Sequence, residues 1–298
     1  MTGLPDLHRH LDGSLRQETI EQLAKAQQVY IPRRLKFHKG MGLEEALSKF
    51  KFTLEVLQGP EAVRRVASEV CEDAAAEGVT TLEIRFGPQL HRGASSEAIV
   101  DAALEGANGR AGLILCGLYG EPPEILESHV RIAASRPGVV GIDLAGGPSS
   151  AHRYILEDYA RAFRMAEEHG IGRTVHAGEG RPADEIAMAV ESLHAQRIGH
   201  GISLLDDLGV TELILEREVT LEACITSNLQ TGCIDHADDH PLRRWIEMGV
   251  RACVCTDNTL LSDVTSTSEH ALARTIPGMT QELLDRAVAW GHAGAFKR

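Results

Sequence analysis

The stretch Leu4-Pro-Asp-Leu-His-Arg-His10 decides how the rest of the chain is interpreted. It predicts a short β-strand over Pro5–His10. Side chains two residues apart in a strand project to the same side, so His8 and His10 should face one way. In a helix they would lie about 200° apart, because each residue advances by about 100°. Two imidazoles on the same side of a strand are a candidate metal-chelating pair.

Further short strands follow, and helices alternate with them. The other predicted strands are Val79–Phe86, Leu113–Leu118, Val139–Leu144, Arg173–His176, Arg197–Gly199, Val219–Cys224 and Val250–Cys255. Helices are predicted near 96–108, 122–135, 151–169, 183–194, 207–216 and 240–248. Over 151–169 the apolar residues Ile155, Tyr159 and Phe163 recur every four residues, as on one face of a helix. Alternating strands and helices are typical of parallel βα units. We therefore expect the α/β class and a closed (β/α)8 barrel, the TIM barrel.

Residues 17–77 interrupt this alternation. They contain three predicted helices, near 17–29, 42–57 and 60–76, and no strand. We interpret them as a helical insertion after strand one that lies over the barrel mouth. A barrel of about 250 residues with an insertion fits the chain length of 298 residues. A single barrel domain over residues 1–298, with the helical insertion at about 17–77, is therefore expected.

Composition excludes several classes of partner. The net charge of -13 argues against nucleic acid, because phosphate binding needs a basic surface. No run of 18 apolar residues is present, and the N-terminus does not resemble a signal peptide, so no membrane partner is expected. The six cysteines include no CxxC pair, which favours free, mostly buried thiols in a reducing compartment. The cytoplasm is the expected location, and nothing in the sequence indicates an oligomeric state.

Five polar side chains stand at the ends of predicted strands. His8 and His10 end the first strand, His176 ends the fifth, His200 follows the sixth and Asp257 follows the eighth. Active sites of such barrels form at the C-terminal ends of the strands, so these five should meet in one site. The remaining histidines form no such set and are interpreted mostly as surface or loop residues: His38, His91, His129, His152, His169, His194, His236, His240, His270 and His292.

This set of residue types suits hydrolytic chemistry. Imidazoles with a carboxylate are typical zinc ligands, and a catalytic zinc keeps one position open for water. Glu179 lies three residues after His176 and should face the same pocket, where it can shuttle a proton, while His200 can orient or deprotonate the water. A binuclear hydrolase of this fold usually needs a modified lysine after strand four. Residues 139–148 contain no lysine, which favours one metal ion per chain.

Several motifs occur together in one order along the chain. They are LPDLHRHLDGSLRQET (4–19), EGVTTLEIRFGPQL (77–90), GIDLAGG (141–147), HAGEG (176–180), RIGHG (197–201), SNLQTG (227–232) and CTDN (255–258). In these motifs the chain resembles the adenosine deaminase family of the amidohydrolase superfamily. The resemblance implies a zinc ion held by His8, His10, His176 and Asp257. It also implies Glu179 as the proton shuttle to purine N1, and His200 as the residue that aligns and deprotonates water.

The resemblance extends to the substrate pocket. It implies that the backbone of Gly146 contacts purine N3, that Asp12 reaches the sugar, and that Leu47, Phe50 and Leu54 form an apolar lid over the ribose. Many relatives carry a second aspartate where this chain has Asn258, at the position that contacts purine N7. An aspartate must be protonated to donate there, whereas the amide of Asn258 donates at any pH.

Three functions remain open from the sequence. The first is hydrolytic deamination of adenosine or 2′-deoxyadenosine to inosine or 2′-deoxyinosine with release of ammonia. The second keeps the reaction but acts on another aminopurine, such as adenine, N6-methyl-AMP or an aminofutalosine-like nucleoside. The third is a purine-binding protein without turnover. The presence of Glu179, His200 and Asp257 together argues against the third function. The expected partner is a small aminopurine nucleoside.

Overall fold

Parallel strands form the centre of the molecule. The computed structural model describes residues 3–149 and 151–297, and its eight strands pair in sequence order from β1 to β8. A bridge between Arg9 and Asp257 joins β1 to the segment after β8, which completes the ring of strands. The bounds are β1 Leu4–His10, β2 Val79–Phe86, β3 Gly112–Leu118, β4 Val139–Ala145, β5 Gly172–Ala177, β6 Arg197–His200, β7 Thr220–Ala223 and β8 Arg251–Val254. The predicted (β/α)8 TIM barrel is confirmed, with every strand boundary within one residue of its predicted position.

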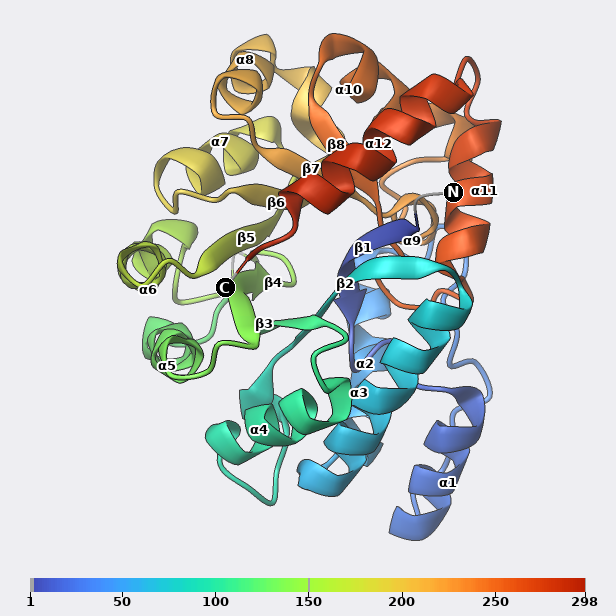
Figure 1. Ribbon diagram of the computed structural model, residues 1–298, viewed down its shortest axis with the longest axis vertical. Helices are drawn as coiled ribbons and strands as arrows, with labels where there is room; N and C mark the ends of the chain where they lie inside the picture. The colour runs from blue at the N-terminus through green and yellow to red at the C-terminus, as the bar shows by residue number, and fades with distance from the viewer. Residues whose placement is uncertain (1–2, 150, 298) are drawn as a thin grey trace.

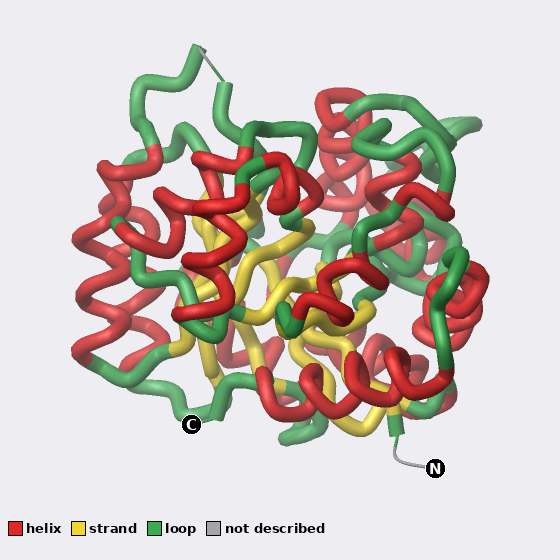
Figure 2. The backbone as a smooth tube through the Cα atoms, turned by 90° about the horizontal axis from the view of Figure 1, so that it is seen from above, coloured by secondary structure: helices red, strands yellow, loops and turns green. Residues whose placement is uncertain are grey.

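Helices surround the strands on the outside (Figures 1 and 2). The outer helices are α3 Gly59–Ala76, α4 Ser96–Ala107, α5 Pro123–Ala134, α6 Ala160–Glu168, α7 Ala183–Glu191, α8 Leu208–Glu216, α10 Leu242–Met248 and α12 Gln281–Gly294. Further helices are α1 Gln17–Gln27, α2 Leu43–Val56, α9 Ile225–Gln230 and α11 Ser266–Thr275, and 3₁₀ turns are η1 Pro88–Leu90, η2 Leu156–Tyr159, η3 Ile202–Asp206 and η4 Ala237–Asp239. None of the helices described here is both long and apolar enough to cross a bilayer.

The predicted helices differ from the structure in two places. The helix predicted over 151–169 begins only at Leu156, as the turn η2, because Ile155 is 61% exposed and its N–H donates to the side chain of Asp158. Of the three residues in the predicted pattern, Tyr159 and Phe163 are buried and Ile155 is not. In addition, α9, α11 and α12 were not among the predicted helices, although the side chain of Thr280 accepts a hydrogen bond at the start of α12, as an N-cap residue does.

The insertion after β1 is shorter than the predicted range of 17–77. Helix α3 packs against α4 and β2, and its apolar side, including Val63, Val66 and Val70, is buried. A helix with such a face belongs to the outer ring of a barrel. The segment that lies over the mouth of the barrel is therefore confined to the residues between β1 and α3, with α2 as the element that lines the cavity described below.

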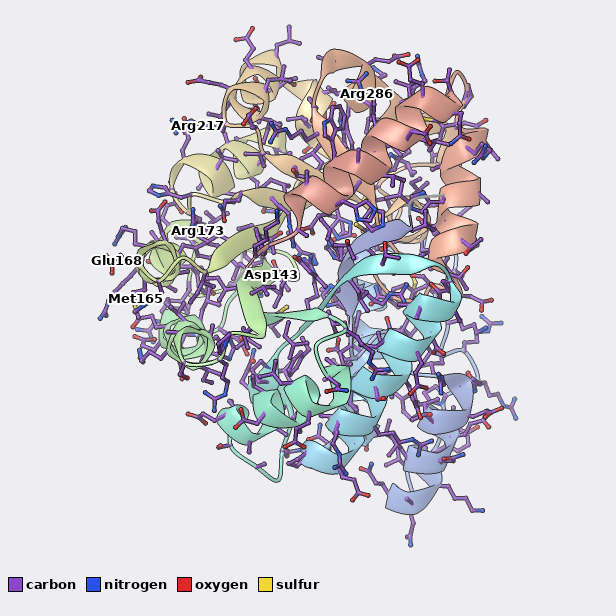
Figure 3. All side chains as sticks on the ribbon, viewed as in Figure 1. Asp143, Met165, Glu168, Arg173, Arg217 and Arg286 are labelled. Carbon is purple, nitrogen blue, oxygen red and sulfur yellow. The ribbon has the colours of Figure 1, made fainter. Side chains whose placement is uncertain are left out.

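The interior of the barrel is partly charged. Side chains of Glu83, Arg85, Asp143, Arg197 and Glu222, from four strands, are buried there and joined by ion pairs. Figure 3 shows Asp143 at the centre of the molecule, in contrast to Glu168, Arg217 and Arg286 near its periphery. All six cysteines are free and five are buried, as predicted.

The C-terminal segment closes the end of the barrel opposite the site. The guanidinium carbon of Arg197 lies 3.7 Å from the ring centroid of Phe296, and the Phe296 N–H donates to Glu83 at 2.6 Å. A side chain at Gly141 or Gly172 would collide with the Phe296 ring. In Figure 1 the chain accordingly ends beside β4 and β5. This ring covers the charged interior on one side.

Three histidines correct the interpretation of the remaining histidines as surface or loop residues. His91, His129 and His240 are at most 4% exposed. His91 bonds to the carbonyl of Leu57, His129 lies on the buried side of α5, and the ring of His240 packs against Trp245. Tertiary packing covers all three side chains, which the sequence alone does not show.

Candidate active site

The structure brings the predicted metal ligands together at the C-terminal ends of the strands. His8 and His10 project from β1 to the same side, as predicted, and each has its Nε2 atom 3.5 Å from Asp257 Oδ1. His176 comes from the end of β5, and its Nε2 lies 3.2 Å from Nε2 of His10. Three imidazoles and one carboxylate therefore point their free atoms at one place.

This arrangement fits a metal ion. Nε2 of His8 is buried and has no hydrogen-bond partner among the described residues. The Nε2 atoms of His10 and His176 face each other, and their lone pairs repel unless a cation lies between them. The other ring nitrogens are occupied: Nδ1 of His8 lies 2.6 Å from Glu222 and Nδ1 of His176 lies 3.1 Å from Asp143. A carboxylate behind a ligand histidine orients the ring and makes it a stronger donor to a metal.

The two supporting carboxylates are ionised. Burial alone would raise the pKa of Asp143 and of Glu222, but the neighbouring cations outweigh burial and both pKa values lie below the ordinary range. For Asp143 the neighbours that lower the pKa are His176, which is hydrogen-bonded to it, and Arg85, and for Glu222 they are Arg85 and Arg197. An ionised carboxylate only accepts hydrogen bonds, so each imidazole donates its Nδ1–H and leaves Nε2 free.

Glu179 and His200 form an acid/base pair beside the ligands. Their Oε2 and Nε2 atoms are 3.5 Å apart. Burial, and secondarily the negative charge of Asp257, raises the pKa of Glu179 to about 8, so it carries a proton at neutral pH. Burial lowers the pKa of His200 well below its ordinary value, so its ring is neutral. Asn228 holds that ring from behind, with its amide nitrogen 3.1 Å from Nδ1.

The backbone at the site is strained in two places. His200 and Asp257 have φ angles of 67° and 61°, a left-handed conformation that costs a residue with a side chain about 1–3 kcal/mol. Hydrogen bonds at 2.7 Å hold Asp257 on both sides, because its N–H donates to the carbonyl of His8 and its own carbonyl accepts from the N–H of His10. The conformation aims both side chains at the common centre.

A cavity of about 910 Å³ opens above these residues. Apart from His8, which lies fully buried beneath it, all of the predicted site residues line its wall: His10, Asp12, Leu47, Phe50, Gly146, His176, Glu179, His200, Asp257 and Asn258. Leu47, Phe50 and Leu54 come from α2, and the Phe50 ring lies edge-on to His10 with centroids 6.0 Å apart. Apolar side chains therefore cover one side of the cavity, opposite polar groups.

The polar lining includes two side chains with unused hydrogen-bonding capacity. Asp12 is buried, its Oδ1 has no hydrogen-bond partner in the described part of the chain, and burial raises its pKa to about 7. Oδ1 of Asn258 is also unpaired, and a Cβ on Gly13 would lie 1.9 Å from it, so this side chain can lie where it does only because residue 13 is glycine. Gly146 has a φ of 79°, which residues with a side chain rarely adopt.

The residues that hold the site from behind were not predicted from the sequence. These are Asp143 and Glu222, Arg85 between them, and Asn228 behind His200. One signal was available: charged residues stand inside strands that are otherwise apolar, and a buried charge needs a partner. The partners come from strands far apart in the sequence, so their pairing is visible only in the fold.

Comparison with known proteins identifies the family of this chain. The family model described as adenosine deaminase matches residues 4–297. A probable adenosine deaminase of Dictyostelium discoideum is 34% identical over 98% of this chain, which spans 40% of that relative's length. An adenosine deaminase of Clostridium acetobutylicum is 35% identical over 89% of this chain and 84% of its own. The solved adenine deaminase of Arthrobacter aurescens has the same fold, with a TM-score of 0.88, 24% identity, and coverage of 100% of this chain and 95% of its own. The chain therefore belongs to the adenosine deaminase family.

Proposed function

We propose that this protein is a zinc-dependent deaminase that converts adenosine and 2′-deoxyadenosine to inosine and 2′-deoxyinosine, with water consumed and ammonia released. The observation that carries the proposal is the convergence of His8, His10, His176 and Asp257 beside the pair Glu179 and His200, at the floor of one cavity. Membership of the adenosine deaminase family supports the reaction class. The names of the curated relatives support adenosine as the substrate.

The metal ligands in this proposal are His8, His10, His176 and Asp257, and the ion is a single zinc. Neutral imidazoles with one carboxylate and no thiolate suit a catalytic zinc site. When bound, zinc supplies Lewis acidity, which lowers the pKa of a coordinated water from about 15.7 toward 7. Ion pairs of Asp143 and Glu222 hold two of the imidazoles in place for this role.

Glu179 and His200 move protons at the reacting atoms. Because Glu179 is protonated at neutral pH, it can donate to purine N1 while the water oxygen bonds to C6. His200 is neutral and lies next to Glu179, so it can orient or deprotonate the attacking water. The C6–N6 bond then breaks, the amine takes up a proton, and ammonia leaves with the 6-oxopurine as the second product.

The remaining wall of the cavity binds the nucleoside. The amide of Asn258 donates to purine N7, the backbone of Gly146 contacts N3, and Asp12 accepts a hydrogen bond from a sugar hydroxyl. Leu47 and Phe50 cover the sugar, because both extend from α2 into the cavity. Burial raises the pKa of Asp12 to about 7, so about half of these side chains are ionised at neutral pH, and the ionised form repels a 5′-phosphate.

A panel of aminopurines tests the proposal. Adenosine, 2′-deoxyadenosine, adenine, N6-methyl-AMP and an aminofutalosine-like nucleoside are compared by kcat/KM, from the ultraviolet change as each loses its amino group. Adenosine and its deoxy form should be the best substrates, by at least about tenfold. A clear preference for adenine or for the phosphorylated nucleotide would refute the substrate assignment, and tight purine binding without turnover would refute the enzymatic function.

A further inference from the structure

Arg85 occupies the centre of the barrel, directly behind the metal ligands. It lies on β2, has no solvent-exposed surface, and uses its guanidinium fork on two carboxylates from distant strands. Nη1 donates to Asp143 Oδ2 at 2.9 Å, and Nη2 donates to Glu222 Oε2 at 2.8 Å. Nη2 also donates to the carbonyl of Leu7, the residue before the first ligand, at 2.7 Å.

Both of these carboxylates are the ones that orient ligand histidines. Glu222 accepts from His8 through the same Oε2 atom that Arg85 contacts, whereas Asp143 accepts from His176 through Oδ1 and from Arg85 through Oδ2. The resulting chain runs imidazole, carboxylate, guanidinium, carboxylate, imidazole. It joins β1, β7, β2, β4 and β5 across the barrel.

We propose that Arg85 is a positioning residue for the metal site, which holds the two carboxylates, and through them the two ligand imidazoles, in one rigid frame. Without a cation between them, two buried carboxylates would repel each other and turn away from the histidines. With Arg85 in place, two of the four metal-binding atoms are aimed before a metal arrives. The inference rests on the proposed metal site and extends it to a residue that touches neither metal nor substrate.

Arginine is required here for its shape as well as its charge. Its planar fork presents two parallel donors that can engage two acceptors at fixed angles, whereas the lysine ammonium is a compact charge on a flexible stem. Lysine at position 85 keeps the positive charge in the barrel but cannot bridge Asp143 and Glu222 with the same geometry. Arg85→Lys therefore separates the bridging role from charge balance.

The test measures zinc affinity by competition with a chelator, together with the melting temperatures of metal-free and zinc-loaded protein. Arg85→Lys should weaken zinc binding about 10- to 100-fold, the usual effect of losing support behind a ligand, and should shrink the rise in melting temperature on adding zinc. At saturating zinc much of kcat should return while KM for adenosine stays close to wild type.

Arg197→Lys is the matched control. Arg197 is an equally buried barrel arginine that donates to the other oxygen of Glu222, Oε1, at 2.8 Å and to Glu83. It should lose stability in both metal-free and zinc-loaded forms but lose clearly less zinc affinity than Arg85→Lys, because Arg197 contacts only one of the two supporting carboxylates. Equal zinc affinity in Arg85→Lys and wild type, or equal losses in the two lysine variants, would overturn the proposal.

A second pair of variants covers the case in which Arg85→Lys does not fold. Asp143→Asn and Glu222→Gln keep the side-chain size but weaken one half of the bridge each. Each should weaken zinc binding, and the double variant should lose less than the product of the two, because both halves depend on the same guanidinium. Unchanged zinc affinity in both single variants would contradict the inference. Failure of the wild type to bind zinc would instead refute the proposed function, so the two failures are distinguishable.

Discussion

Replacement of Glu179 by glutamine tests the chemistry of the site most directly. Glu179→Gln keeps the size and one hydrogen-bonding oxygen but cannot donate and recover a proton. The wild-type side chain is 7% exposed, and burial raises its pKa to about 8. A glutamate with an ordinary pKa near 4.3 would be almost entirely ionised at pH 7 and unable to protonate purine N1.

The expected magnitude follows from this pKa. With a pKa of about 8, roughly nine tenths of the molecules carry the proton at pH 7 and roughly one tenth at pH 9. The acid form is the active one, so kcat/KM of the wild type should fall as pH rises through this region. A bound divalent cation favours the carboxylate, so the decline in the zinc-loaded enzyme should begin at or below pH 8. Glu179→Gln should reduce kcat by at least about 10²-fold and abolish this alkaline decline.

The assay is steady-state kinetics on adenosine from pH 6 to 10, followed by ultraviolet absorbance, with zinc content measured on the same samples. Zinc content of the Gln variant should match wild type, because Glu179 is not among the proposed ligands. A variant with kcat within about threefold of wild type would refute the role of Glu179 as proton donor. So would an unchanged alkaline decline in the variant, or a loss of activity fully explained by lost zinc.

Four further outcomes are expected. Chelation should abolish activity reversibly, with about one zinc per chain restoring it; full activity of metal-free protein would exclude a metal role. Asp12→Ala should narrow the advantage of adenosine over adenine, expected to be at least about tenfold in kcat/KM; an unchanged ratio would remove Asp12 from the sugar site. The wild type should turn over 7-deazaadenosine poorly because it lacks the N7 acceptor for Asn258, so equal rates with adenosine would contradict that contact. Finally, burial lowers the pKa of His129 to about 4, below an unfolded value near 6.5, so wild-type stability should be complete above pH 6.5 and decline as pH falls toward 4. In His129→Leu the free energy of unfolding at pH 5 should no longer contain this loss of about 2 kcal/mol, as measured by urea unfolding at pH 5 and 8. If the substitution changes the free energy of unfolding equally at both pH values, His129 does not cause the loss of stability in acid.

The sequence by itself determined the barrel and the set of reactive residues. Strand periodicity, with its repeat of two, places His8 and His10 on one side, and alternation of strands with helices leads to a parallel barrel. Because every strand of such a barrel ends at the same face, His176, His200 and Asp257 could be assigned to one site without knowing any distance. Strand periodicity and the order of strands and helices depend on residues that are close in the sequence, so both can be predicted from the sequence.

Only the tertiary structure decided what surrounds those residues. Arg85 contacts carboxylates 58 and 137 positions away in sequence, and no local pattern specifies which strand supplies the partner of a buried charge. The same holds for the pKa of Glu179, which depends on burial created by the whole fold. The limits of the insertion also depended on packing. The amphipathic pattern of α3 does not show which elements the helix packs against, and its contacts with α4 and β2 place it in the outer ring. Pairing across the barrel is a property of three-dimensional proximity, so it appears once the strands are closed into a ring.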